Sequence, residues 1–305
     1  FVAMVNAPRN DVNNMLNIYE QINSNKQRSV LIMSLFVGFI LLAIYSIGYV
    51  FNIEGLMPLA IIFSLFSTGA SYFWGDKIVL SLNGARPASR KEFFDFYTVT
   101  ENLAMVAKIP VPQIYVIDSN AMNAFATGRD PEHAVVCATT GILEKLNRTE
   151  LEGVIGHELA HIKNYDIRLM TIVSILVGSL SILINLASRS MWFGGGRRNN
   201  DDREGNGILM ILGVIMIIFA PIIAQLIQLA ISRRREYFAD ASSVMLTRQP
   251  SGLISALKKL EADRTPQQFA STATASLYIS NPFKGNKLGS LFSTHPPIED
   301  RIKKL

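Results

Sequence analysis

The segment GHELAH, residues 156–161, contains residue types that can bind a metal ion and transfer a proton. His157 and His161 are four residues apart, a spacing that on a helix points both imidazoles the same way, one turn apart. Both rings can therefore reach one metal ion, and Glu158 lies beside the coordination position that is left open. This is the HExxH pattern, which predicts two zinc ligands and a general base. The alternative is a pair of histidines on the surface of a helix.

A catalytic zinc site needs a third protein ligand and keeps one position open for water. The segment EYFAD, Glu236 to Asp240, has two acids four residues apart, which a helix places on one face. Glu236 is the predicted third ligand, and Asp240 is predicted to hydrogen-bond the far nitrogen of a ligand histidine and fix its orientation. The alternative is a solvated helix face whose acids pair with the preceding arginines. His133, in a predicted turn, is expected to be an exposed loop residue.

Four uncharged apolar runs determine where these motifs lie. A run of about 20 apolar residues, at 1.5 Å per residue, crosses a hydrocarbon core of about 30 Å. The sequence therefore predicts four transmembrane helices, at residues 30–51, 56–75, 169–187 and 208–231. A buried core helix would explain one such run, but four of them favour an integral membrane protein.

The last two apolar runs must form a hairpin that returns to one membrane surface. The HExxH segment ends just before the third run and the EYFAD segment begins just after the fourth, so both lie within about 10 Å of the same edge. Lys26 and Arg28 before the first run, with further cations after the second, put the N-terminus and the metal-binding segments in the cytosol. The loop 188–207, which carries four arginines, argues against this orientation.

The remaining patterns predict a mostly α fold of the α+β type, in five parts. Residues 1–29 are expected to be a cytosolic N-terminal segment, and residues 30–75 and 169–231 two transmembrane hairpins. The catalytic domain is divided between residues 76–168, with strands and the HExxH helix, and residues 232–305, with the Glu236 helix and a C-terminal segment. The strands are expected at PQIYVID and HAVVCATTG, which are β-branched and bounded by turn residues.

Local signals support the HExxH helix. Asn147 or Thr149 can cap its start, and Leu151, Val154 and Leu159 form part of an apolar stripe at helical spacing. The stretch 265–294, rich in Thr, Ser, Pro and Gly, is predicted to be a loop that could cover the cleft.

Composition agrees with a membrane protein. The net charge of +5 comes from cations where apolar runs end, so it gives no reason to expect a nucleic-acid partner. Cys137 is the sole cysteine, which excludes an intramolecular disulfide. A scaffold with a structural zinc is a second hypothesis, but such closed sites are usually rich in cysteine. A transporter is a third, although polar residues in the runs more often join helices by hydrogen bonds.

Four motifs, in this order around the apolar runs, resemble the HtpX-type membrane zinc metalloproteases: NAFATG, GHELAHIKNYD, EYFAD and HPPIEDRI. These bacterial heat-shock proteases are gluzincins related to the CAAX prenyl endopeptidases, and the resemblance covers residues 17–305. It implies a multi-pass endopeptidase of the bacterial inner (plasma) membrane with a zincin-like cytosolic catalytic domain and one zinc ion. The implied substrates are misfolded or damaged membrane proteins, cleaved at the membrane surface in quality control and the stress response.

The resemblance also implies a role for each matching residue. Three residues would bind zinc: His157, His161 and Glu236. Glu158 would be the base that activates the water molecule. Two C-terminal residues would lie near the zinc and stabilise the tetrahedral intermediate or hold the substrate: His295 and Arg301. An extended substrate would lie along an edge strand formed by Asn123, Ala124, Phe125 and Ala126. The implied partners are protein substrates and the lipid bilayer, with no nucleic acid.

Overall fold

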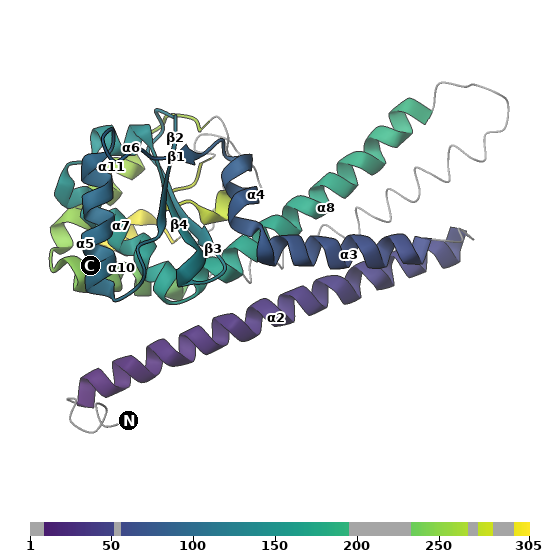
Figure 1. The fold of residues 1–305 in the computed structure, drawn as a ribbon, viewed down its shortest axis with the longest axis horizontal. Helices are drawn as coiled ribbons and strands as arrows, with labels where there is room; N and C mark the ends of the chain where they lie inside the picture. The colour runs from purple at the N-terminus through teal and green to yellow at the C-terminus, as the bar shows by residue number, and fades with distance from the viewer. Residues whose placement is uncertain (1–8, 52–55, 195–232, 268–273, 283–295) are drawn as a thin grey trace.

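Long helices extend from a smaller domain in which shorter helices surround a sheet (Figure 1). The computed structural model describes residues 9–51, 56–194, 233–267, 274–282 and 296–305. The long helices are α2 (Arg9–Phe51), α3 (Leu56–Phe73) and α8 (Asp166–Gly194). They pack against one another through a buried apolar cluster that includes Ile32, Phe36, Ala60 and Leu176.

The four-stranded sheet has the order β1-β2-β4-β3. Its strands are β1 (Arg86–Pro87), β2 (Gln113–Ile117), β3 (Ala124–Gly128) and β4 (Ala134–Thr139). β2 and β4 are parallel, while β1 and β3 run antiparallel to their neighbours. All residues of β3 and β4 are buried, because helices cover both faces of the sheet. Because β3 is last in the strand order, it is an edge strand of the described sheet.

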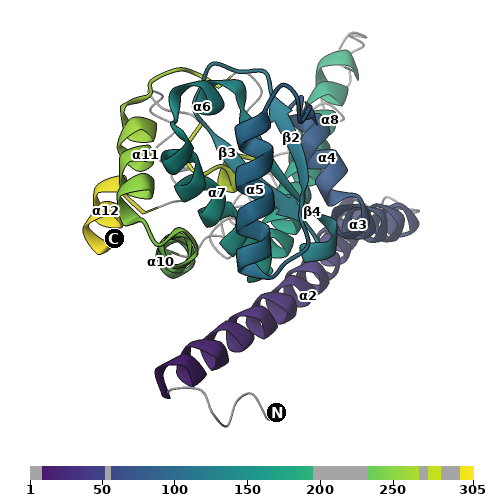
Figure 2. The ribbon, with the colours of Figure 1, turned by 60° about the vertical axis from the view of Figure 1, so that its left-hand side comes forward.

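Helix α7 (Arg148–Lys163) lies at the centre of the domain, and Figure 2 shows α5 (Phe94–Ala107) and α11 (Pro250–Ala262) on either side of it. Asn147 begins α7 in a capping box: its side chain accepts from the Glu150 amide, and Glu150 accepts from the Asn147 amide. The apolar stripe of α7 enters the main core, which includes Phe96, Val154 and Leu257. The expected helix and its Asn147 cap are confirmed.

Two glycines let neighbouring helices approach α7 closely. A Cβ atom at Gly153 would lie 2.7 Å from the Leu253 Cα atom of α11. A Cβ atom at Gly156 would lie 2.8 Å from Ser243 Oγ of α10 (Arg233–Thr247). Ser243 Oγ also donates to the Gly153 carbonyl at 2.6 Å, which fixes α10 against α7. The close approach brings α10 to the histidines of α7.

Short elements complete the described chain. They are α4 (Gly75–Leu82), η1 (Pro131–His133), α6 (Thr140–Lys145), η2 (Ala275–Leu277) and α12 (Ile298–Lys304). The mostly helical fold with a small sheet, and the strands at PQIYVID and HAVVCATTG, are confirmed. The segment 274–282, inside the stretch predicted to be a loop, packs its Leu277, Tyr278 and Ile279 side chains into the core.

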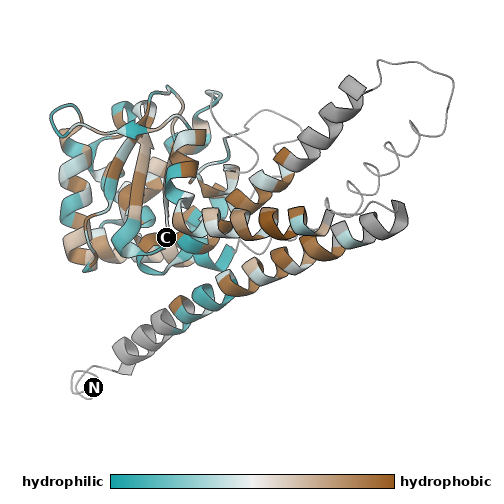
Figure 3. Cartoon of the chain, turned by 45° about the vertical axis from the view of Figure 1, so that its right-hand side comes forward, coloured by the Kyte–Doolittle hydropathy of each residue, from teal (hydrophilic) through white to brown (hydrophobic). Residues whose placement is uncertain are grey.

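One described helical segment, Ile22–Leu42 of α2, is by itself long and apolar enough to cross a membrane. Figure 3 shows the change from hydrophilic to hydrophobic residues along this helix. The pairs α3–α4 and α7–α8 qualify only as bent units, with bends of 85° and 84°, so up to three spans pass the test. The predicted run 169–187 lies within α8, and the predicted run 208–231 lies outside the described residues.

Candidate metal centre

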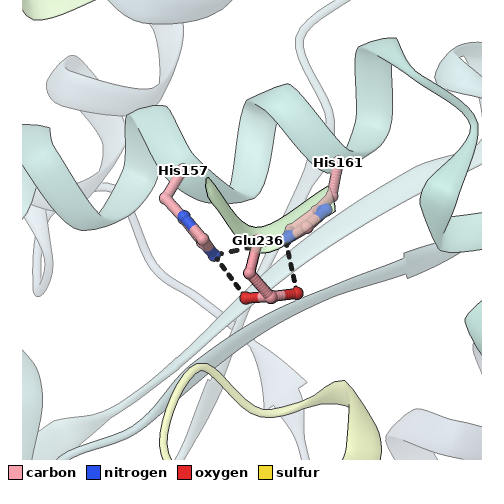
Figure 4. A group of neighbouring side chains, drawn as sticks. All are labelled: His157, His161 and Glu236. Atoms are coloured by element: carbon pink, nitrogen blue, oxygen red, sulfur yellow. Dashed lines mark hydrogen bonds and ion pairs between the residues drawn. The ribbon is translucent and has the colours of Figure 1, made fainter. Parts of the chain in front are cut away.

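The side chains of His157, His161 and Glu236 point toward one another between α7 and α10 (Figure 4). One ligand atom from each lies within 4.8 Å of the other two, and all three residues are buried. The two Nε2 atoms are 3.2 Å apart. The Glu236 carboxylate lies 3.5 Å from His157 Nε2 and 3.6 Å from His161 Nε2. The structure thus brings together residues from two segments that are 75 positions apart or more in the chain.

These separations fit the binding of a single metal ion. Metal–ligand bonds of about 2.0–2.1 Å in a tetrahedral zinc site put neighbouring ligand atoms about 3.3–3.4 Å apart. The observed separations of 3.2, 3.5 and 3.6 Å lie close to that value. Two imidazoles and one carboxylate are also the donor set of catalytic sites that keep a fourth position for water.

Glu158 lies on the same helix and is buried at 2% exposure. Burial raises the pKa of its carboxyl group, although the neighbouring histidines oppose this effect when they are charged. A carboxylate with a raised pKa is a stronger proton acceptor than one in water, which suits a general base.

Asp240 and Arg301 lie behind His157. His157 Nδ1 is 2.9 Å from Asp240 Oδ1, so its Nε2 atom faces the metal-binding position. Arg301 of α12, fully buried, donates to both carboxylate oxygens of Asp240, at 2.8 Å from Nε and 2.6 Å from Nη2. Burial alone would raise the pKa of Asp240, but hydrogen bonds from Arg301 and His157 lower it to about 2. The carboxylate therefore stays ionised and holds the imidazole.

The same contacts change the protonation of His157. Burial alone would lower its pKa, but hydrogen bonds to the carboxylates of Asp240 and Glu236 raise the pKa of His157 to about 9. A metal ligand must be a neutral imidazole. Metal binding near neutral pH therefore requires that His157 lose a proton.

A different group lies behind His161. Its Nδ1 atom is 3.1 Å from Asp166 Oδ2, at the start of α8, and Asp166 Oδ1 accepts a hydrogen bond of 2.7 Å from Asn25 of α2. Neither contact is among those predicted from the sequence. Asp166 follows His161 by only five residues, so the sequence alone could have indicated their contact. Asn25 is 141 positions from Asp166, and no sequence pattern joins the two.

The predicted substrate strand is the β3 edge, and part of this edge is covered. The Ala124 carbonyl accepts from the Ile279 amide at 2.9 Å. Asn123 and Ser280 also exchange two hydrogen bonds, from Asn123 Nδ2 to the Ser280 carbonyl at 2.8 Å and from the Ser280 amide to Asn123 Oδ1 at 3.2 Å. The packed segment 274–282 therefore lies along the Asn123 end of β3. His295 lies outside the described residues.

Along β3, residues whose backbone groups bond to β4 alternate with residues whose amide and carbonyl face the edge of the sheet. The Thr139 amide donates to the Asn123 carbonyl, so odd-numbered residues of β3 pair with β4 and even-numbered ones face the edge. At the edge, the Gly128 amide donates to Thr171 Oγ1 at 3.2 Å. The amide and carbonyl of Ala126 have no partner on that side among the residues that the structure describes. Within the described part of the chain, the backbone groups of Ala126 are thus open at the edge.

Known proteins resemble this chain over most of its length. Residues 91–305 match peptidase family M48. The "Protease HtpX homolog" of Lactobacillus helveticus (strain DPC 4571) is 46% identical over 295 residues, which cover 94% of this chain and 99% of that protein. The protein of the same name from Streptococcus uberis (strain ATCC BAA-854 / 0140J) is 43% identical over 301 residues, with the same coverage of both proteins.

A solved structure is also similar. The crystal structure of S. mikatae Ste24p superposes with a TM-score of 0.46 and 19% identity, covering 93% of this chain and 66% of that one. The family match and the two HtpX homologues cover well over half of the chain. The chain therefore belongs to peptidase family M48, as a metalloprotease of the HtpX type.

Proposed function

We propose that the chain is a zinc endopeptidase that cleaves misfolded or damaged membrane proteins at the cytosolic surface of a bacterial inner membrane. The observation that carries this proposal is the convergence of His157, His161 and Glu236, with Glu158 buried beside them. Zinc is the proposed metal because the two nitrogens and one carboxylate have the spacing of tetrahedral ligands and leave a fourth position for water.

The residues around the site divide the chemical work. Zinc, when bound, would polarise both water and the scissile carbonyl. Glu158 takes a proton from the attacking water as the water oxygen forms the new C–O bond, and then passes that proton to the leaving amine as the peptide C–N bond breaks. Burial supports this role, because it raises the proton affinity of the Glu158 carboxylate.

Positioning and stabilising groups surround this reaction. Asp240 holds the His157 ring, and Arg301 holds Asp240 through two hydrogen bonds. Arg301 therefore acts from behind the ligand. His295, six residues before Arg301, is proposed to donate a hydrogen bond to the oxyanion that develops on the scissile carbonyl.

An extended substrate is proposed to add to the β3 edge, which is formed by Asn123, Ala124, Phe125 and Ala126. Strand addition needs free amide and carbonyl groups on the edge. Ala126 supplies one such pair, while the segment 274–282 already pairs with Ala124. The proposed register therefore centres the substrate backbone on Ala126.

Membrane attachment explains the substrate class. The apolar segment Ile22–Leu42 can cross a bilayer, and α2 packs against α3 and α8. We propose a multi-pass arrangement with four transmembrane helices, and with the N-terminus and the catalytic domain in the cytosol. The cations before the first apolar run and after the second support this orientation. A site held at the membrane surface would reach misfolded membrane proteins.

The test compares zinc content and cleavage of an unfolded membrane protein in detergent for wild type, Glu158→Gln and Glu152→Gln. Glu152 is a matched control on α7, with its side chain 34% exposed. We expect about one zinc in each protein, and activity lower by about 10²–10⁴-fold in Glu158→Gln alone. A chelator should abolish wild-type cleavage.

Other outcomes would each contradict a specific part. Wild-type cleavage by Glu158→Gln would remove Glu158 as the base. A wild type that binds no metal would remove the metal site itself. Zinc in every variant without cleavage in any would favour a scaffold with a structural metal.

A further inference from the structure

A buried amide group of α2 lies against the bend between α7 and α8. Asn25 is 3% exposed. Its Nδ2 atom donates to the Asn164 carbonyl, at the C-terminal end of α7, at 2.9 Å, and to Asp166 Oδ1, at the start of α8, at 2.7 Å. A carboxamide has two N–H donors, and these contacts use both. Asn25 therefore ties α2 to the residues that follow the HExxH motif.

Asp166 joins this amide to a candidate metal ligand. One carboxylate oxygen accepts from Asn25, and the other lies 3.1 Å from His161 Nδ1. His161 Nε2, on the opposite side of the ring, faces Glu236 at 3.6 Å. Only Asp166 and the ring itself separate the Asn25 amide from the nitrogen that faces the metal-binding position.

The chemistry of an asparagine suits this place. A buried carboxylate needs hydrogen-bond donors for both of its oxygens. The Asn25 amide supplies such a donor at 2.7 Å without adding charge, and the Arg235 guanidinium lies farther away, 3.7 Å from the same carboxylate oxygen. The Asn25 oxygen is also used, because Arg235 Nη1 lies 3.4 Å from it. Removing the amide would leave an Asp166 oxygen and the Asn164 carbonyl without this donor in a buried site.

We propose that Asn25 is a positioning residue of the metal centre, which holds Asp166 so that His161 presents Nε2 to the metal. The proposal rests on the proposed function, in which His161 is a zinc ligand. Asn25 lies in the segment Ile22–Leu42, which can cross a membrane. The docking of this anchor helix against the bend between α7 and α8 thereby contributes to metal binding.

The test measures metal binding by the full chain in detergent for wild type, Asn25→Leu, Asn25→Asp and Ser29→Ala. Leucine has a similar volume and no donor, while aspartate keeps the shape and places a second carboxylate beside Asp166. Ser29 is the matched control: it is 1% exposed and one turn further along α2, and within the described residues its side chain bonds only the Asn25 carbonyl, at 2.8 Å. Zinc dissociation constants come from competition with a chelator, and the visible spectrum of the Co²⁺-loaded protein reports ligand geometry.

We expect both Asn25 variants to bind zinc about tenfold more weakly, at the lower end of the usual effect of losing a group that orients a ligand. Their Co²⁺ spectra should change, while Ser29→Ala stays within about twofold of wild type. Asn25 variants that melt earlier without metal but bind zinc with wild-type affinity and an unchanged Co²⁺ spectrum would overturn the proposal, since Asn25 would then only pack the helices.

A double variant tests the route through Asp166. Asn25→Leu combined with Asp166→Asn should bind zinc no more weakly than Asp166→Asn alone, because both changes break one chain of contacts. If the two losses of zinc affinity add, Asn25 does not act through Asp166. If Asn25→Leu does not fold, the pair Asn25→Asp and Asp166→Asn makes the same test. A wild type that binds neither metal would overturn the proposed function and this inference together, whereas equal binding by wild type and Asn25 variants would overturn this inference alone.

Discussion

The Nδ1 atoms of His157 and His161, one helical turn apart, face two different parts of the molecule. Behind His157 is an ion pair from the C-terminal part of the chain: Asp240 at 2.9 Å, held by the buried Arg301. Behind His161 is Asp166 at 3.1 Å, held by the amide of Asn25 from the anchor helix at 2.7 Å, with the Arg235 guanidinium 3.7 Å from the same carboxylate oxygen. One metal-binding position therefore depends on two supports that differ in the closeness of their ion pairs and in origin.

Loss of each support should have a different effect on stability and on metal binding. Breaking a buried ion pair by removing one partner leaves an uncompensated charge, which costs about 3–5 kcal/mol. Losing a hydrogen bond between an amide and a carboxylate costs less, about 1–3 kcal/mol, through desolvation of the group left behind. The His157 side should therefore affect both folding and metal binding, and the His161 side mainly metal binding.

The largest effect is expected from Asp240→Asn, which breaks the His157 side. Zinc affinity should fall about 10–100-fold, because the ring loses the carboxylate that orients it. The free energy of unfolding should fall by about 3–5 kcal/mol, because Arg301 is left buried without its partner. Chelator competition and chemical denaturation in detergent measure the two quantities.

Two further variants act as controls for Asp240→Asn, one at an exposed ion pair elsewhere and one that removes both partners of the buried pair. Glu101→Gln breaks the exposed pair with Arg90, 2.7 Å long, and should change stability by less than about 1 kcal/mol. Asp240→Asn with Arg301→Met should regain part of the lost stability but not the zinc affinity. Wild-type zinc affinity in Asp240→Asn would show that Asp240 does not support the site.

The sequence predicts residues that share a helix face better than residues that meet across the fold. The four-residue spacings of His157 and His161, and of Glu236 and Asp240, follow from helix geometry, and both pairs lie on helices as expected. The Asn147 cap and the strands are equally local signals. Asn25 and Arg301 could not be assigned to their acids in this way, because 141 and 61 positions separate the partners.

Hydropathy marks only part of one helix. The sequence predicts a cytosolic N-terminal segment up to residue 29 and a transmembrane span from residue 30. In the structure α2 runs unbroken from Arg9 to Phe51. Hydropathy reports what can lie in a membrane, whereas backbone hydrogen bonds continue across the change from polar to apolar residues. Because the helix is continuous, Asn25 lies on the same helix as the apolar segment and contacts Asp166 beside the metal centre.

The second prediction breaks the His161 side with Asp166→Asn. The asparagine oxygen can still accept from His161 Nδ1, and the cation that loses a charged partner, Arg235, lies 3.7 Å from Asp166, farther than Arg301 lies from Asp240. We expect zinc affinity to fall by about tenfold, at the lower end of such effects. The free energy of unfolding of the metal-free protein should change by less than in Asp240→Asn. A larger loss of stability than in Asp240→Asn would reverse the comparison of the two sides.

The third prediction concerns the pH dependence of zinc binding, which should depend on the carboxylate behind His157 more than on the one behind His161. The pKa of His157, raised to about 9, lies above the ordinary value of about 6.5. Protonated His157 therefore stabilises the metal-free protein below about pH 6.5, and this stabilisation is lost as the pH rises through about 9. Zinc needs the neutral ring, so zinc affinity should increase, by up to about tenfold per pH unit, over the same range.

The variants test which support sets this pH dependence. Asp240→Asn removes a carboxylate that raises the pKa of His157, so its affinity should rise less steeply with pH above about 7. Asp166→Asn leaves those contacts intact and should keep the wild-type slope. Titrations of zinc binding at several pH values compare the three proteins. Equal slopes in all three would show that Asp240 does not hold the proton on His157.

The smallest effect is expected from Gly156→Ala, beside His157. The added Cβ atom would lie 2.8 Å from Ser243 Oγ, so α10, which carries Glu236 and Asp240, must shift by a few tenths of an ångström. Such overpacking costs about 1–3 kcal/mol of unfolding free energy. Because a small shift keeps every ligand, zinc affinity should fall by less than in Asp166→Asn. Gly69→Ala on α3 is the control, since nothing lies within 4 Å of its added Cβ atom.

Ser243→Ala shows whether the added methyl group acts through α10. Alone, this variant loses the hydrogen bond to the Gly153 carbonyl and should cost about 1 kcal/mol. Combined with Gly156→Ala, it removes the oxygen that the methyl group meets, so the double variant should lose less stability than the sum of the two. Additive losses would mean that Gly156→Ala acts within α7. The loss of stability in Gly156→Ala would then report strain in the α7 backbone beside His157, and not the position of α10.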